Sequence, residues 1–128
     1  MILIADDDSD LAENCSMMLE SYGYEVSVVS NGLEALAKIS EQQPELLISD
    51  CCMPGMTGPQ LSDRLKASAA DAHIPILLMS GSLQCEVANG TAHDAFLRKP
   101  FLAEELMLEV RKLLQNSVRT ELAYSGHA

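Results

Sequence analysis

The stretch LLISDCCMPGMTG, residues 46–58, joins a short apolar run to a loop rich in chain-breaking residues. The run leads to Asp50, and Pro54, Gly55 and Gly58 follow closely. A short apolar run bounded by turn-forming residues predicts a buried strand, which here would end at Asp50. The same arrangement, an apolar run that ends at a polar residue, recurs on both sides of this stretch.

Short apolar runs alternate with helical patterns along the whole chain. The predicted strands cover residues 2–5, 24–30, 46–48, 76–79 and 95–98. Helices are predicted where apolar residues recur at helical spacing: Leu11, Cys15, Met18, Leu19 and Tyr22; Leu33, Leu36 and Ile39; Leu61 and Leu65; and Leu102, Leu106, Val110, Leu113 and Leu114. Repeated alternation of this kind predicts an α/β fold, in which helices cover both faces of a doubly wound, five-stranded parallel sheet.

Length and charge limit the classes of function. The chain has 128 residues, which fits one domain, and a formal net charge of -11 at pH 7. This excess of acid argues against direct binding to nucleic acid or to an anionic membrane surface, since both need clustered Lys and Arg. The apolar runs are far shorter than the roughly 20 residues that span a bilayer, and the first residues do not resemble a signal peptide. We therefore expect a cytoplasmic protein without membrane insertion.

Polar side chains follow the predicted strands at their carboxyl ends. They are Asp6, Asp7, Asp50, Ser80 and Lys99. In a doubly wound sheet, ligands bind outside this edge. Carboxylates that converge there repel one another unless a cation joins them, and Mg²⁺ is a divalent ion that prefers carboxylate and phosphate oxygens. Because an ammonium and a hydroxyl can hold phosphoryl oxygens, the set predicts a phosphoryl site in which a carboxylate can be the nucleophile.

Four segments, in order, resemble the receiver domain of bacterial two-component response regulators. They are ILIADDD at residues 2–8, DCCMPGMTG at 50–58, MSG at 79–81 and FLRKPF at 96–101. The resemblance runs from about Met1 to Gln115, and it implies a flavodoxin-like (βα)5 fold with strand order 2-1-3-4-5. We therefore expect a receiver domain at residues 1–115, followed by a helix extension or linker at residues 116–128.

The resemblance implies a phosphoacceptor function in phosphorelay signal transduction. Asp50 would take the phosphoryl group from a phosphohistidine on a sensor histidine kinase or phosphotransfer domain, forming an aspartyl phosphate. Asp7 and Asp50 would ligate Mg²⁺, or Mn²⁺, together with the backbone carbonyl of Cys52, while Asp6 would act through water. A receiver catalyses only its own phosphorylation and dephosphorylation, so we expect a signalling protein and not an enzyme.

The resemblance also implies a conformational switch. Ser80 and Lys99 would hold phosphoryl oxygens, and movement of Ser80 toward the phosphoryl group would let Phe96 turn inward. From the residues alone, Phe96 is explained equally well as part of the core. The Lys99–Pro100 peptide bond is typically cis in the family, and proline is the residue for which a cis bond is inexpensive.

The chain departs from the family between Ser80 and Lys99. This stretch is shorter than usual by about one helical turn, and it contains Asn89-Gly90. We therefore expect a short, shifted or partly unwound fourth helix within residues 81–93. That helix forms part of the family's output and dimerisation surface, so the departure bears on the output and leaves the phosphoryl site intact.

Two other functions are compatible with some of these features. A small Mg²⁺-dependent phosphatase or phosphotransferase of the haloacid-dehalogenase type also forms an aspartyl phosphate after its first strand. In that type of enzyme the second Asp lies two residues after the first, and a Thr or Val lies two residues further on. Here Asp10 occupies that position after Asp6 and Asp8. An interaction module that no longer phosphorylates is disfavoured because every needed side chain is present. A receiver would act with a fused or separate effector or kinase domain, and a weak homodimer is compatible with the family.

Overall fold

The computed structural model describes residues 1–81 and 94–125, with side chains as far as Gln115. Its elements along the chain are β1 (Ile2–Ala5), α1 (Ser9–Ser21), β2 (Val26–Val29), α2 (Gly32–Glu41), β3 (Leu46–Asp50), α3 (Gly58–Ala67), β4 (Ile76–Ser80), β5 (Ala95–Arg98) and α4 (Ala103–Ser125). The strands form one parallel sheet in the order β2-β1-β3-β4-β5. The predicted doubly wound, five-stranded sheet and its strand order are confirmed.

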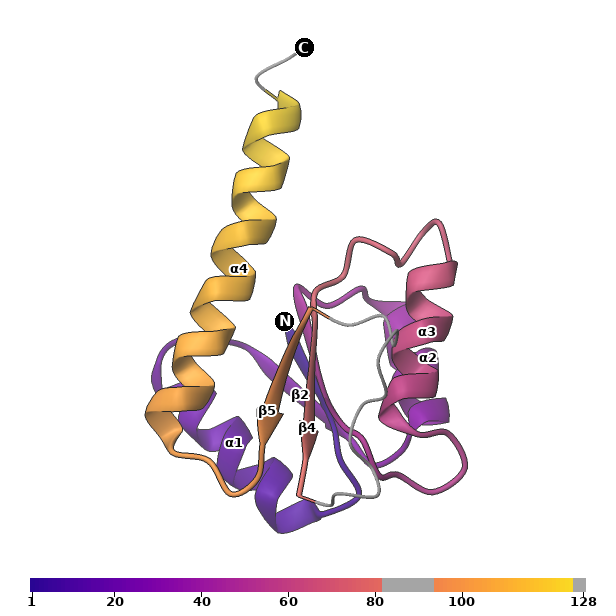
Figure 1. Cartoon of the computed structure of the whole chain (residues 1–128), viewed down its shortest axis with the longest axis vertical. Coiled ribbons are helices and arrows are strands. Elements are labelled where there is room, and N and C mark those ends of the chain that lie inside the picture. The colour runs from indigo at the N-terminus through magenta and orange to yellow at the C-terminus, as the bar shows by residue number, and fades with distance from the viewer. Residues whose placement is uncertain (82–93, 126–128) are drawn as a thin grey trace.

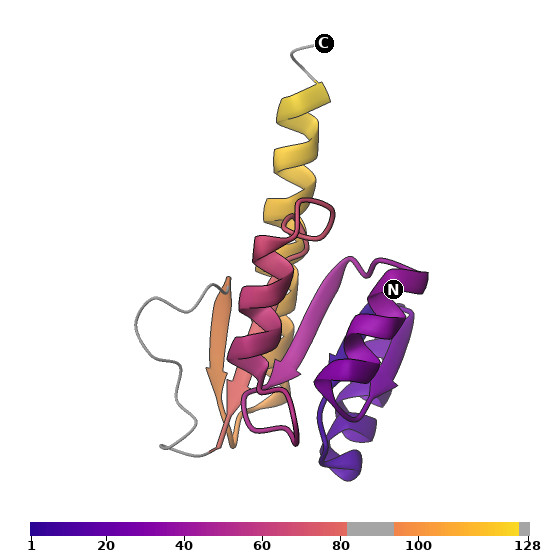
Figure 2. The ribbon, with the colours of Figure 1, turned by 90° about the vertical axis from the view of Figure 1, so that its right-hand side faces the viewer.

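Helices α1 and α4 pack on one face of the sheet, and α2 and α3 pack on the other (Figure 1 and Figure 2). Successive residues of a strand point to opposite faces. In β1, Ile2 and Ile4 belong to the apolar cluster under α1 and α4, whereas Leu3 and Ala5 belong to the cluster under α2 and α3. Both faces of this central strand are buried, which explains why its sequence is a continuous apolar run.

The strand predicted at residues 24–30 is shorter in the structure, where β2 covers Val26–Val29. Gly23 adopts a left-handed conformation with a φ of 92°. The N–H of Tyr24 then donates to the carbonyl oxygen of Leu19 at 3.2 Å. Tyr24 therefore belongs to the turn that ends α1, and its aromatic side chain wrongly suggested an earlier strand start.

Side-chain caps begin the helices that follow the first three strands. Asp8 caps α1 by accepting an N–H of the first turn at 3.2 Å, and Asn31 caps α2 in the same way at 2.8 Å. Thr57 caps α3 in a reciprocal capping box with Gln60. These caps lie at the carboxyl edge of the sheet, so they fix the loops that surround this edge.

Helix α4 continues beyond the domain predicted from the resemblance. It runs from Ala103 to Ser125 and projects past the sheet (Figure 1). The short or irregular helix expected within residues 81–93 lies outside the described residues. Of the helices that the structure describes, none is both long and apolar enough to cross a membrane.

Replacement of Leu77 tests the packing of the sheet. Leu77 lies in β4 and is fully buried, so Leu77→Ala leaves a cavity and is expected to lower the free energy of unfolding by about 3 kcal/mol. Urea denaturation followed by circular dichroism measures this loss. Leu108→Ala is the control because Leu108 is 53% exposed on α4, and it should change stability by less than about 0.5 kcal/mol. Equal losses in the two variants would contradict this packing.

Candidate functional site

Three carboxylates meet at the carboxyl edge of the two central strands. Asp6 and Asp7 follow β1, and Asp50 ends β3, which pairs directly with β1. One carboxylate oxygen from each residue lies within 4.8 Å of the others. Asp6 and Asp50 are buried and Asp7 is exposed, so the cluster is open to solvent on the Asp7 side.

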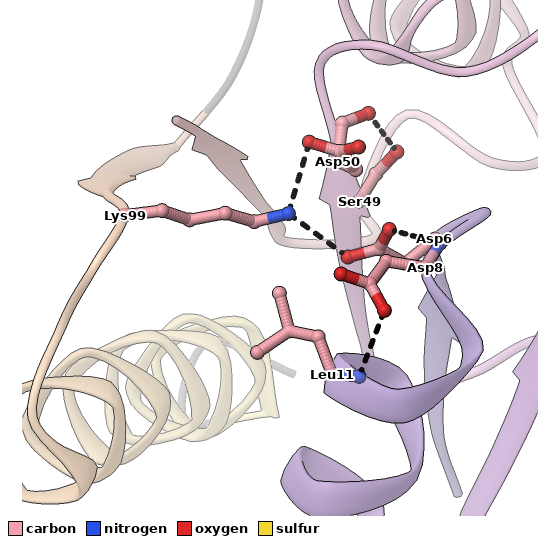
Figure 3. A network of polar contacts seen from close by, with 6 residues as sticks. All are labelled: Asp6, Asp8, Leu11, Ser49, Asp50 and Lys99. Carbon is pink, nitrogen blue, oxygen red and sulfur yellow. Dashed lines mark hydrogen bonds and ion pairs between the residues drawn. The ribbon is translucent and has the colours of Figure 1, made fainter. Parts of the chain in front are cut away.

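The ammonium of Lys99 bridges the two buried carboxylates (Figure 3). Lys99 Nζ lies 3.1 Å from Asp6 Oδ2 and 3.3 Å from Asp50 Oδ1. Burial alone would lower the pKa of Lys99, but attraction to Asp50 and Asp6 outweighs burial and raises this pKa above its ordinary value. Lys99 is therefore a fixed cation at neutral pH. From the resemblance, Lys99 was expected to hold phosphoryl oxygens, and the structure shows its ammonium paired with two carboxylates.

The cluster sets three carboxylates beside the ammonium of Lys99, and burial disfavours the ionised form of Asp50. Burial raises the pKa of Asp50 above its ordinary value, and repulsion from Asp6 raises it further. Lys99 and a hydrogen bond from the Cys52 N–H act in the opposite direction and offset these effects only in part. A further cation among the carboxylates would relieve the imbalance, and carboxylate oxygens are the donors that hard divalent ions prefer. The cluster can therefore hold a metal ion.

Two buried thiols lie close to this cluster. Burial, with a smaller contribution from Asp50, raises the pKa of Cys51 to about 11. Burial and repulsion from Asp6 also raise the pKa of Cys15 above its ordinary value. Because the thiolate is the form that attacks electrophiles, the raised pKa values make these two thiols poor nucleophiles at neutral pH.

Backbone contacts fix the position of Asp50. The Ser49 hydroxyl donates to the Asp50 carbonyl oxygen at 3.1 Å, and the Gly58 N–H donates to the Cys51 carbonyl oxygen at 3.0 Å. A Cβ on Gly58 would collide with the Asp50 carbonyl group, so glycine is required where α3 begins against the end of β3. The sequence indicated a loop at Gly58 but not its contact with Asp50, because this contact depends on how the loop closes.

The other predicted site residues lie on β4, on β5 and in the adjoining loops. Ser80 is buried at the end of β4, and its carbonyl oxygen accepts the Lys99 N–H at 2.8 Å. Phe96 lies half-buried on β5, against the apolar cluster under α2 and α3. Cys52 follows Asp50 in the loop before α3, and the Lys99–Pro100 peptide bond is cis.

The variant Asp50→Asn tests the charge imbalance in metal-free protein. A raised pKa means that the folded protein binds a proton at Asp50 more readily than the unfolded chain does. The wild-type fold therefore loses stability as pH rises through the range between the unfolded and folded pKa values of this carboxyl group. We expect Asp50→Asn to be more stable than wild type at neutral pH, and this advantage should shrink in acid, where wild-type Asp50 is protonated. Urea denaturation in EDTA, at neutral and at acidic pH, measures the difference in free energy of unfolding between the two proteins. A difference independent of pH would contradict the prediction.

Comparison with known proteins identifies the family. The family model of the response regulator receiver domain matches residues 2–111. The DNA-binding response regulator MtrA of Mycobacterium tuberculosis (strain ATCC 25618 / H37Rv) is 32% identical over 119 residues, which cover 91% of this chain and 51% of MtrA. The response regulator MprA of Mycobacterium leprae is 33% identical over 125 residues, which cover 97% of this chain and 55% of MprA. The chain thus spans about half the length of these curated relatives.

Solved structures share the fold. The signal receiver domain of a signal transduction histidine kinase from Syntrophus aciditrophicus is 34% identical with a TM-score of 0.84, and the match covers 90% of this chain and 89% of that one. The receiver domain of NtrX from Brucella abortus is 28% identical with a TM-score of 0.82, over 90% of this chain and 98% of that one. These matches favour a receiver over a phosphatase of the haloacid-dehalogenase type. The chain belongs to the response regulator receiver domain family, whose members act in two-component signal transduction.

Proposed function

We propose that Asp50 accepts a phosphoryl group from a phosphohistidine on a sensor histidine kinase or phosphotransfer domain. In this step the P–N bond of the phosphohistidine breaks, a P–O bond forms at an Asp50 carboxylate oxygen, and the imidazole leaves with the electron pair. The observation that supports the proposal is the cluster of Asp6, Asp7 and Asp50, in which Lys99 bridges the two buried members. Phosphoryl transfer needs positioning and charge neutralisation above all, and this cluster supplies both.

Asp7 and Asp50 would hold Mg²⁺, or Mn²⁺, together with the backbone carbonyl of Cys52, and Asp6 would hold the ion through water. The donors fit because all of them are oxygens and the three carboxylates already lie within 4.8 Å of one another. When bound, the ion supplies positive charge to the phosphoryl oxygens. Asp7, on the solvent side of the cluster, is the carboxylate that an incoming ion meets first.

Lys99 would have two roles. In the metal-free protein it neutralises Asp6 and Asp50, whose carboxylates it bridges. In the phosphorylated protein its ammonium would leave a carboxylate to hold one phosphoryl oxygen, and the Ser80 hydroxyl would donate to another. Movement of Ser80 would then let Phe96 turn inward from its half-buried place on β5 and pass the signal to the protein surface.

The receiver domain in this proposal covers residues 1–115, and residues 116–128 are a helix extension or linker. Since the chain spans about half of its curated relatives, we place the output in an effector or kinase domain, fused or separate. The net charge of -11 disfavours direct contact with nucleic acid. We place the domain in the cytoplasm, where it can form a weak homodimer and catalyses only its own phosphorylation and dephosphorylation.

Intact mass spectrometry after incubation with acetyl phosphate and Mg²⁺ tests the acceptor. Wild-type protein should gain one phosphoryl group, and Asp50→Asn should gain none because it lacks the attacking carboxylate. Asp10→Asn is the control, since Asp10 is an exposed acid on α1, and it should react like wild type.

A gain in Asp50→Asn would move the acceptor to another residue. Wild-type protein that binds Mg²⁺ and still gains nothing would favour the alternative of an interaction module that does not phosphorylate.

The variant Lys99→Met tests the competition between Lys99 and the metal ion. The ammonium occupies Asp6 and Asp50 in the metal-free protein, so its removal is expected to tighten Mg²⁺ binding by about tenfold, or 1.4 kcal/mol. Isothermal titration calorimetry measures the affinity. Lys112→Met is the control because Lys112 is exposed on α4 and pairs with Glu109, and its Mg²⁺ affinity should match wild type. Weaker binding in Lys99→Met would show that Lys99 supports the ion and does not compete with it.

A further inference from the structure

The start of α2 touches the loop between β3 and α3 at Gly32. Gly32 is buried, and a Cβ built on it would lie 2.8 Å from the Cβ of Met56 and 3.1 Å from both its Cγ and its Sδ. Contacts between Cβ atoms and their neighbours essentially never fall below 3.0 Å in proteins. There is therefore no space for a methyl group at residue 32 unless one of the two segments moves.

The α2 side of this contact is held in place. The Asn31 side chain accepts the Glu34 N–H at 2.8 Å and caps the helix. The carboxylate of Glu34 in turn accepts the backbone N–H and the hydroxyl of Ser30, each at 3.1 Å. Residues on both sides of Gly32 are thus tied to the first turn of α2, so a clash at Gly32 would displace the loop and not the helix.

The β3–α3 loop would be displaced as a whole, because its atom nearest to the added methyl group is the Cβ of Met56. A Cβ is bonded to the backbone, so it cannot move aside by a change of rotamer as the far end of a side chain can. The Met56 N–H donates to the Pro54 carbonyl oxygen at 3.0 Å, and the Gly58 N–H donates to the Cys51 carbonyl oxygen at 3.0 Å. These bonds close the loop into a unit, so a shift of Met56 reaches the backbone beside Asp50.

We propose that Gly32 is a positioning residue for the metal site. The absence of a side chain at Gly32 leaves the space in which Met56 packs, and the packed Met56 holds the loop that carries the Cys52 carbonyl and follows Asp50. The inference rests on the proposed function, because the position of the Cys52 carbonyl matters for affinity only if this carbonyl binds the metal ion. It adds the first residue of α2 to the residues that determine metal affinity.

The variant Gly32→Ala, studied by ¹H–¹⁵N NMR in metal-free protein, tests the contact itself. The amide resonances of residues 52, 53 and 55–58 should shift, because the loop is displaced. Leu33→Ala is the matched control, since Leu33 is the next residue of α2 and is 67% exposed, and it should leave these resonances in place. Shifts confined to α2 in Gly32→Ala would overturn the proposal.

Titration of the same proteins with Mg²⁺ tests the consequence for the site. Gly32→Ala should bind Mg²⁺ about fivefold more weakly than wild type, which is within the range of coupling between contacting residues. Leu33→Ala should bind as wild type does. In a Met56→Gly background the Cβ on the loop is absent, so adding Gly32→Ala should produce no further loss of affinity.

The outcomes separate this inference from the function on which it rests. Wild-type protein that takes up no Mg²⁺ would overturn the proposed function, and this result would appear before any variant is made. Wild-type protein that binds Mg²⁺, with Gly32→Ala binding equally well, would overturn only the positioning role. Additive losses from Gly32→Ala and Met56→Gly would also overturn it, since the two changes would then act through separate routes.

Discussion

Two buried carboxylates held beside the ammonium of Lys99 are the constraint on which the site depends. Asp50 ends β3 and Asp6 directly follows β1, so the register of these two paired strands brings them together whatever their charges favour. Lys99 bonds to both, yet the pKa of Asp50 stays raised. Burial of the central strands thus keeps the carboxylates close together, although they would move apart in an unfolded chain. Their mutual repulsion favours the entry of a cation.

The capped starts of the helices hold the loops that surround the carboxylate cluster in place. The β1–α1, β2–α2 and β3–α3 loops each end at a capped helix, with Asp8, Asn31 and Thr57 as the caps. Asp8 and Asn31 lie within three residues of a strand end, and Thr57 caps the far end of the longer β3–α3 loop, so the caps limit how far these loops can widen the cluster. Close approaches at Gly32 and Gly58 tighten the frame further, since side chains there would have to occupy space already filled by Met56 or by the Asp50 backbone.

Local patterns predicted the parallel sheet and the meeting of three carboxylates at its edge, whereas other contacts between distant segments were not predictable. Continuous apolar runs identified strands buried on both faces, and a parallel sheet then placed Asp6, Asp7 and Asp50 at one edge. The predicted start of β2 was wrong because Gly23 and Tyr24 complete the turn that ends α1. Strand propensity does not distinguish such a turn residue from the first residue of a strand. The double ion pair of Lys99 could not be inferred, because spacing along the chain fixes the strand that carries a side chain but not the number of partners it reaches.

The place of Lys99 in the fold links the charge of the site to β5, a strand at one edge of the sheet. Lys99 and Asp6 are 93 residues apart in the sequence, and they meet because β5 adds to the edge of the sheet beside β4. The ion pairs of Lys99 therefore help to tie this edge strand to β1 and β3. β1 and β3 are buried on both faces, whereas β5, on which Phe96 lies, pairs with β4 and has this further link to the cluster through Lys99. Two strands that are buried on both faces thus present the carboxylates, and the cation that bridges two of them directly follows the strand at the edge of the sheet.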